Sequence, residues 1–330
     1  MTKIRWGVLS TAKIAREYVI PAINASTLGE VIATSSRREG QAQAEAEKLG
    51  IPRYYDSYQA LLDDPDIDAI YNPLPNHLHV PWSVKAIEAG KHVLLEKPAG
   101  LNAADLEPLM AAAARHPEVK VMEAFMYRFH PQWQTILKLC KDIGPIRHIQ
   151  AMFSYNNRDA DNIRNSAAMG GGALMDVGCY GISLARLVFG SEPLRAMGLL
   201  QKLDGYEVDC ITSGLLEFAD GLANFTCSTK TEPGQWADIR GENGCIRLSP
   251  PFNPTATNAV HINVKRHDVS EEIIIPATNQ YGCMTDAFAR AILDNKSVPT
   301  PLTDALENML VIDALFKSAE ENRWVNVSGH

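Results

Sequence analysis

The chain has 330 residues, of which 46% are hydrophobic and 21% are charged. Such a composition supplies enough apolar surface for a large core, and the length suggests about two domains. The formal net charge of -8 and the isoelectric point near 5.6 argue against nucleic acid or anionic lipid as a partner, because phosphate binding needs clustered lysine and arginine.

The cysteines and the apolar runs indicate the cellular compartment. The six cysteines lie far apart and include no Cys-x-x-Cys pair, which predicts free thiols rather than a zinc site or a disulfide framework. The apolar stretch after Arg5 breaks at Ser10, too early for a signal-peptide core. No apolar run approaches the length of a membrane span. We therefore expect a cytoplasmic protein with no membrane partner and no metal.

The first third of the chain alternates short β-branched runs with segments of helical periodicity. This is the pattern of βαβ units on a parallel sheet. The predicted helices cover residues 14–25, 41–49, 80–89 and 103–115, the last with Asn102 as its N-cap. The predicted strands cover residues 4–9, 31–35, 67–71, 93–95 and 120–124.

The second part of the chain has a different rhythm. After a predicted helix at 131–141, strands follow one another with Gly and Asp turns, which implies an antiparallel sheet. A surface helix is expected at 303–321. The predicted strands are 146–155, 194–203, 212–218, 222–228, 236–240, 245–248, 259–265 and 271–275.

These patterns predict a fold of two domains. Residues 1–123 would form an α/β Rossmann domain with a doubly wound parallel sheet. Residues 124–330 would form an α+β domain with a large, mostly antiparallel, open-faced sheet.

The junction of the first strand and first helix stands where a dinucleotide fingerprint belongs. Its three glycine positions are filled by Ser10, Ala12 and Ala15. Small side chains still allow a pyrophosphate to approach the helix N-terminal amides. Taken alone, the segment could equally be an ordinary tight turn. The predicted cofactor contacts are Ser10, Thr11, Ala12, Lys13 and Ile14.

The end of the second strand indicates which dinucleotide is bound. An NAD enzyme usually carries an acidic residue there, whereas this chain has Ser36, Arg37 and Arg38. Guanidinium and hydroxyl groups suit a 2′-phosphate, so NADP(H) is the preferred cofactor and NAD(H) the alternative. Glu39 is the opposing signal, because an inward carboxylate would favour NAD(H). A solvated basic pair at a helix start is the ordinary structural interpretation.

Four motifs occur in order along the chain. They are Pro-Asn-His-Leu-His at 75–79, Glu-Lys-Pro at 96–98, Glu-Ala-Phe-Met-Tyr-Arg-Phe-His-Pro at 123–131 and Gly-Gly-Gly-Ala-Leu-Met-Asp-Val-Gly-Cys-Tyr at 170–180. The ordered set resembles the glucose-fructose oxidoreductase / inositol dehydrogenase (Gfo/Idh/MocA) family across nearly the whole chain. Tyr180 stands where inositol dehydrogenases place histidine, so the chain looks most similar to the branch of dimeric dihydrodiol dehydrogenase and NADP-dependent D-xylose dehydrogenase.

The resemblance implies residue roles. Lys97 and Tyr180 would be catalytic, and Asp176 would orient the substrate. The resemblance also implies a cis Lys97–Pro98 peptide. It further implies that residues 1–123 bind NADP(H) and that residues 124–330 bind the substrate and form a homodimer through the open face of the second sheet, which needs a cover. The remaining cofactor contacts would be Pro73, Leu74, Asn76, His79, Glu96 and Lys97, with His79 and Glu96 beside the nicotinamide half.

Elementary chemistry favours the same residues. A phenol has a pKa near ~10, so Tyr180 needs a nearby cation such as Lys97 to act as a base at neutral pH. Lys97 follows a parallel strand, at the edge where an open α/β sheet exposes its ligand crevice. Asp176 and Tyr180 would share a face if 175–188 is helical. Each residue alone has a structural explanation, as surface lysine, core tyrosine or helix cap, and their joint occurrence favours function.

These observations predict an NADP-dependent oxidoreductase. It would transfer hydride between the nicotinamide and a sugar or related cyclic polyol or carbonyl compound, as D-xylose or D-glucose 1-dehydrogenases and trans-dihydrodiol dehydrogenase do. The alternatives are a glycoside-cleaving relative that uses NAD transiently, a non-catalytic NADP(H) sensor, and a structural dimerisation module. The predicted substrate contacts are Phe125, Phe153, Arg158, Arg164 and Asp176.

Overall fold

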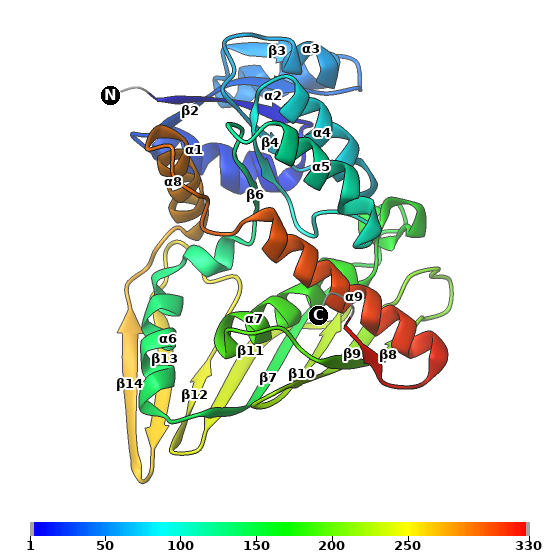
Figure 1. Ribbon diagram of the computed structural model, residues 1–330. Helices are drawn as coiled ribbons and strands as arrows, with labels where there is room; N and C mark the ends of the chain where they lie inside the picture. The colour runs from blue at the N-terminus through cyan, green and yellow to red at the C-terminus, as the bar shows by residue number, and fades with distance from the viewer. Residues whose placement is uncertain (1–2, 328–330) are drawn as a thin grey trace. The chain divides into compact units, whose positions relative to one another are not determined.

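The computed structural model describes residues 3–327 (Figure 1). Their contacts group into two compact units. The first contains residues 3–129 and Asn279–Leu306, and the second contains His130–Thr278 and residues 307–327. The sequence assigns 279–306 to the second domain, whereas its contacts are with the first unit.

The first unit is built on a six-stranded sheet in the order β3-β2-β1-β4-β5-β6. All five pairings are parallel, so the predicted doubly wound sheet is confirmed. The order reverses between β1 and β4, which is the point at which sheets of this type bind their ligands. The strands are β1 (Ile4–Leu9), β2 (Gly29–Ser35), β3 (Arg53–Tyr55), β4 (Ala69–Asn72), β5 (His92–Leu95) and β6 (Val121–Glu123).

Helices accompany this sheet at the predicted places, and further ones occur. The predicted helix 14–25 contains a π-helical turn, η1 (Ala15–Val19), followed by α1 (Ile20–Ala25). The sequence patterns did not indicate β3, α3 or α8; β3 and α3 are short, and α8 lies between the predicted strand 271–275 and the predicted helix 303–321. The others are α2 (Gln41–Leu49), α3 (Tyr58–Leu62), η2 (Asn76–Leu78), α4 (His79–Glu88), η3 (Ala104–Leu106), α5 (Glu107–Arg115), η4 (Met126–Phe129) and α8 (Gln280–Leu293).

Helix α8 explains why 279–306 groups with the first unit. The side chain of Asn279 caps the helix by accepting hydrogen bonds from the amides of Tyr281 and Gly282. Phe288 is buried, and its ring lies 5.7 Å from that of Trp6 on β1. Apolar burial against the first strand therefore draws this late segment back to the Rossmann sheet.

The second unit contains a nine-stranded sheet in the order β14-β13-β12-β11-β7-β10-β9-β8-β15. Only the pairing of β7 with β10 is parallel, so the predicted mostly antiparallel sheet is confirmed. The strands are β7 (Ile146–Asn156), β8 (Arg195–Gln201), β9 (Ile211–Phe218), β10 (Gly221–Ser228), β11 (Lys230–Gly241), β12 (Gly244–Leu248), β13 (Val260–Arg266), β14 (Val269–Ile275) and β15 (Val325–Asn326).

Helices cover only one face of this sheet. Figure 1 shows α6 (Pro131–Asp142) and α7 (Cys179–Phe189) on the same side, and α7 packs on β7 and β10. The other face is open: Leu199 is 74% exposed, whereas Leu216, which points to the helices, is 0% exposed. The remaining helical elements are η5 (Ile163–Asn165), η6 (Ala167–Met169), η7 (Leu174–Gly178) and α9 (Leu302–Glu321).

One helical stretch differs from the expectation that no apolar run approaches the length of a membrane span. Among residues 3–327, Ala167–Phe189 is long and apolar enough to cross a membrane by length and composition. The expectation that no apolar run reaches the length of a membrane span was therefore wrong for this stretch. The structure buries 83% of the apolar window inside the protein, as for the core helix of a soluble protein.

Candidate active site

The turn after β1 has the geometry of a dinucleotide-binding loop. Ser10, at the first glycine position of the fingerprint, has a φ of 70°, a left-handed conformation that glycine usually supplies. Its hydroxyl accepts a hydrogen bond from the Ala12 amide at 3.3 Å, which supports the turn locally. A helix begins at Lys13, so its first amides lie at the carboxyl edge of β1. This loop therefore fits a pyrophosphate, although it lacks the glycines.

The end of β2 presents two exposed guanidinium groups. Ser36 is buried, and its hydroxyl accepts a hydrogen bond from the Arg38 amide at 3.1 Å. The Arg37 guanidinium lies over the Tyr58 ring, 5.4 Å from its centroid. Arg38 and Glu39 are exposed. A bent turn that carries two arginines suits a phosphate dianion.

His79 connects two loops of the first unit. It is 1% exposed, and its Nδ1 and Nε2 lie 2.8 Å from the Pro98 carbonyl and 2.7 Å from the Leu74 carbonyl. Burial lowers the pKa of His79 to about 4, against the opposing effect of the two carbonyls. The imidazole thus lies between the loop before α4 and the turn after β5, and as a neutral ring it donates to one of the two carbonyls. A direct contact of His79 with a cofactor stays a prediction.

Lys97 lies directly beyond the carboxyl end of β5. The predicted cis Lys97–Pro98 peptide is confirmed. The preceding Glu96 accepts a hydrogen bond from the Tyr71 hydroxyl at 2.7 Å, and its amide donates to the Asn72 carbonyl at 3.1 Å. Lys97 thus directly follows, in the chain, a carboxylate that a side chain of β4 holds in place.

Tyr281, at the start of α8, belongs to the same edge and was missed by sequence reasoning. Burial raises its pKa, and the charge of Glu96 adds to this effect while the charge of Lys97 opposes it. Its ring lies 5.1 Å from that of Tyr18 on η1. No sequence signal linked Tyr281 to Lys97, because the two lie far apart in the chain.

In the second unit, Tyr180 sits in an aromatic cluster. It is 4% exposed, and its ring centroid lies 5.3 Å from Phe153 and 5.2 Å from Phe252. Phe153 stacks on Phe252 at 5.4 Å with an interplanar angle of 14°. The two phenylalanines fix the plane of the phenol. Phe252 was missed because it follows a proline-rich turn outside every motif.

Asp176 is held by two donors. The Tyr155 hydroxyl donates to its Oδ2 at 2.5 Å, and Arg164 Nε lies 3.0 Å from the same oxygen. Arg164 is therefore paired with Asp176, while Arg158 is exposed on the same loop. Tyr155 was missed, although it lies two residues after Phe153 on a predicted strand. Residues two apart on a strand point to the same face.

The glycine run before Asp176 permits two close approaches. A Cβ on Gly171 would lie 2.4 Å from the Arg164 carbonyl oxygen, and one on Gly172 would lie 2.2 Å from Asp209 Oδ1. The chain then enters η7, a π-helical turn, before α7. The N-cap of η7 is Ala173, so Asp176 does not cap this helix. Such π turns often occur at functional sites.

The predicted site residues fall into two sets. In the first unit, Glu96, Lys97, His79 and Leu74 adjoin one another, whereas Phe125 is 1% exposed and packs edge-on against Tyr127 at 6.0 Å. A substrate contact of Phe125 stays a prediction. In the second unit, the structure brings together Phe153 with Tyr180 and Arg164 with Asp176.

Two further findings concern metals and cysteines. Within residues 3–327, no group of three or more His, Cys, Asp or Glu side chains is arranged to hold a metal ion. None of the six cysteines forms a disulfide within this part of the chain; they are Cys140, Cys179, Cys210, Cys227, Cys245 and Cys283.

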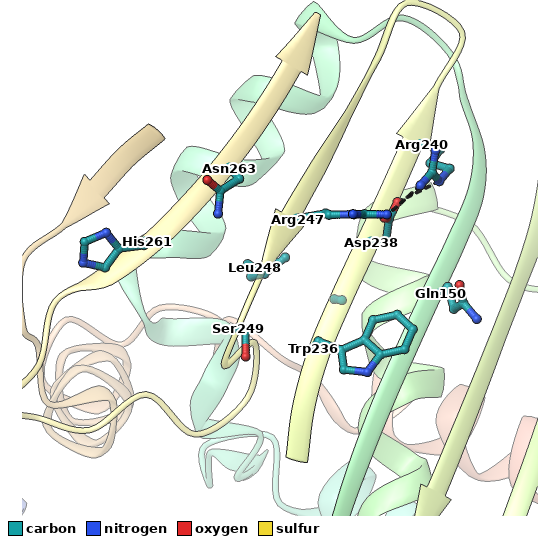
Figure 2. A pocket seen from close by; sticks show the side chains of 10 residues that line it. Gln150, Trp236, Asp238, Arg240, Arg247, Leu248, Ser249, His261 and Asn263 are labelled. Carbon is teal, nitrogen blue, oxygen red and sulfur yellow. Dashed lines mark hydrogen bonds and ion pairs between the residues drawn. The ribbon is translucent and has the colours of Figure 1, made fainter. Parts of the chain in front are cut away.

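A separate hollow of about 480 Å³ lies on the open face of the second sheet (Figure 2). The buried Asp238 pairs there with Arg240 Nε at 2.9 Å and Arg247 Nε at 2.5 Å. Two guanidinium groups thus share one carboxylate. The other lining residues are Gln150, Trp236, Ala237, Leu248, Ser249, His261 and Asn263.

Two family models match the chain. One, described as an oxidoreductase family with an NAD-binding Rossmann fold, covers residues 4–125, and the other, the GFO/IDH/MocA C-terminal domain, covers residues 137–247. The chain belongs to the Gfo/Idh/MocA oxidoreductase family. The resemblance drawn from the four motifs is thereby confirmed.

Individual members of the Gfo/Idh/MocA family match over much of their length. D-xylose 1-dehydrogenase (NADP(+)) 2 from Haloferax volcanii is 36% identical, with 98% of this chain and 99% of the relative covered. Trans-1,2-dihydrobenzene-1,2-diol dehydrogenase from Mus musculus is 30% identical, with 76% of each covered. The crystal structure of a 3-ketoreductase from Actinomadura kijaniata in complex with NADP and TDP-benzene matches with a TM-score of 0.91 at 32% identity, covering 96% of this chain and 98% of that one.

Proposed function

We propose that this protein is an NADP(H)-dependent oxidoreductase that acts on a CH-OH group of a sugar or related cyclic polyol, or on the matching carbonyl. The observation that carries the proposal is the position of Lys97. It follows β5 at the carboxyl edge of a β3-β2-β1-β4-β5-β6 sheet, beside a carboxylate held by Tyr71. A proton-handling group belongs at this edge, where such sheets bind dinucleotides.

The proton is assigned to Tyr180. In the oxidising direction its phenolate takes the proton of the substrate hydroxyl, and the role assigned to Lys97 is to stabilise the developing negative charge. Bound NADP+ supplies the hydride acceptor at C4 of the nicotinamide. In the reducing direction Tyr180 acts as the acid.

Asp176 is assigned to substrate orientation. Its carboxylate accepts from Tyr155 and pairs with Arg164, and these contacts fix the direction in which it can meet a substrate hydroxyl. Holding the reacting carbon in place is a large part of catalysis, because misplacement by about 1 Å can cost roughly 100-fold in rate.

The cofactor preference rests on the end of β2. Arg37 and Arg38 are exposed where a 2′-phosphate would be received, and Glu39 is exposed as well. Relatives whose names or structures include NADP support this assignment. An exchangeable NADP(H) also argues against the glycoside-cleaving alternative, which retains its cofactor.

The substrate class is proposed from the relatives together with the site. Free aldoses, cyclic trans-diols and keto sugars all present a hydroxyl or carbonyl to a Tyr–Asp pair, and the names of relatives include each kind. Aromatic side chains at Phe153 and Phe252 suit the apolar face of a ring. We place the protein in the cytoplasm, with a small carbohydrate-like compound as its substrate.

We also propose that a second copy of the chain covers the open face of the second sheet. Apolar side chains stand out from three adjacent strands, at Leu199 on β8, Leu215 on β9 and Leu222 on β10. The same face carries the hollow around Asp238. Exposed apolar patches of this kind mark protein interfaces.

The deciding experiment is a substrate screen with purified protein. NADP+ and NAD+ are each offered with a panel of aldoses, inositols and cyclic diols, and the reduced nicotinamide is followed by absorbance. We expect turnover with an aldose or a cyclic diol and a higher kcat/KM with NADP+. NADPH binding without any turnover would favour the sensor, and absence of binding would favour the dimerisation module.

A further inference from the structure

Asp209 is a buried carboxylate that the proposed mechanism does not use. It lies in the connection between β8 and β9 and is 3% exposed. Its Oδ2 accepts hydrogen bonds from the Leu174 amide at 2.7 Å and the Thr212 hydroxyl at 2.5 Å. Its carbonyl oxygen accepts from the Ala173 amide at 2.9 Å. Asp209 thus meets two consecutive amides at the start of one helix.

That helix is the one that carries the proposed active residues. Leu174 is the first residue of η7, which contains Asp176 and runs directly into α7 with Tyr180 near its start. The first amides of a helix have no partner within the helix. A carboxylate placed there satisfies them and interacts favourably with the helix dipole. Asp209 therefore caps η7 from a different part of the second unit.

The glycine run is shaped around this carboxylate. Gly172 has a φ of 118°, and a Cβ on it would lie 2.2 Å from Asp209 Oδ1. Any larger residue would push the carboxylate away from the Leu174 amide. Gly172 and Asp209 consequently act together as one structural unit at the start of η7.

We propose that Asp209 is a positioning residue, which fixes the start of η7 and so sets where Asp176 and Tyr180 stand for the reaction. The inference rests on the proposed function of those two residues. Asp209 acts through the main chain of residues 172–174 and needs no contact with the substrate. Burial also raises the pKa of its carboxyl group, an effect that the hydrogen bonds to it oppose.

The kinetic test compares Asp209→Leu with Asp209→Asn. Leucine has a similar shape but accepts no hydrogen bond, so kcat per folded protein should fall by about 100-fold while NADPH affinity is unchanged. The asparagine oxygen can still accept from Leu174, so Asp209→Asn should recover to within about tenfold of the wild type. A kcat of Asp209→Leu within about twofold of wild type would overturn the inference.

Gly172→Ala supplies a second route, should Asp209→Leu fold poorly. It displaces the same turn from the other side, so its kcat should fall together with that of Asp209→Leu, and the double variant should be little worse than either. If the fold-losses in kcat of the two single variants multiplied fully in the double variant, Gly172 and Asp209 would act independently, which would contradict the inference. Thr212→Val is the matched control, because it removes one donor to the carboxylate and leaves the Leu174 bond.

Hydrogen exchange tests the anchor without reference to activity. In Asp209→Leu the amides of residues 172–180 should exchange about tenfold faster, with β13 unchanged. Unchanged exchange at 172–180 would overturn the inference. Faster exchange in a protein whose wild type turns over no substrate would leave the anchor standing and remove the proposed function instead.

Discussion

At the scale of single residues, Lys97 combines a strand end, a neighbouring carboxylate and a following cis peptide. Glu96 is held by the Tyr71 hydroxyl, so the position of the Lys97 backbone is set by two adjacent strands, β4 and β5. Charge placed on such a rigid edge costs little reorganisation during reaction. The ammonium is therefore suited to stabilise an anion that forms only in the transition state.

We expect Lys97→Met to lower kcat by about 100- to 10,000-fold, because general acid–base assistance contributes roughly that much. NADPH affinity, measured by fluorescence titration, should stay near the wild-type value. Lys85→Met, at an exposed lysine of α4, is the matched control and should retain activity. Comparable turnover in Lys97→Met would remove Lys97 from the mechanism.

Tyr155 gives a second prediction at this scale. Tyr155→Phe removes one of the two donors that hold Asp176 and leaves the ring in the sheet. A hydrogen bond to a charged group is worth about 1.5–3 kcal/mol, so kcat/KM should fall by roughly 10- to 100-fold, mainly through KM. Steady-state kinetics checks this, with Tyr54→Phe at an exposed tyrosine as control. An unchanged KM would show that Asp176 does not orient the substrate.

At the scale of elements, long periodic segments were predicted well and short or isolated ones were not. The helix at 41–49 and the strands around 146–155 and 212–218 have clear periodicity and agree with α2, β7 and β9. The three-residue strand β3 is mostly exposed, so it carries no apolar pattern. Helix α8 was missed although Asn279 caps it; its segment lies between the predicted strand 271–275 and the predicted helix 303–321.

His79 links two loops, and its protonation should couple their packing to pH. The folded pKa of about 4 lies below the ordinary value of 6.5, so the unfolded chain binds the proton more readily between these values. The contribution of the neutral His79 to the free energy of unfolding is therefore fully present above pH 6.5 and is lost as the pH falls towards 4. The loss is on the order of 3 kcal/mol, from 1.36 kcal/mol per pKa unit.

Urea unfolding of the wild type and of His79→Gln at neutral and acidic pH checks this expectation. The variant should be less stable at neutral pH and should lose less stability on acidification, since glutamine does not titrate. Parallel pH dependence in the two proteins would show that His79 does not bury a neutral ring.

At the scale of the whole molecule, the proposed dimer through the open face of the second sheet gives a prediction about assembly. Leu215→Glu and Leu222→Glu place charges on adjacent strands of that face. Burying an unpaired carboxylate in an interface costs several kcal/mol, so each variant should sediment as a monomer where the wild type sediments as a dimer. Leu293→Glu, at an exposed leucine of α8, is the control and should leave the assembly intact. A monomeric wild type would remove the proposal.

The sequence by itself determined the sheet types and the family, and it singled out Lys97, Asp176 and Tyr180 as candidates, because these depend on periodicity and on motifs that are local in the chain. Only the tertiary structure decided that Tyr155 and Arg164 hold Asp176 and that Phe252 packs on Tyr180. It also decided that Asp209 caps η7, the helical turn that contains Asp176. Such contacts join residues distant in sequence, and no local pattern encodes which of many compatible side chains will meet once the apolar faces are buried.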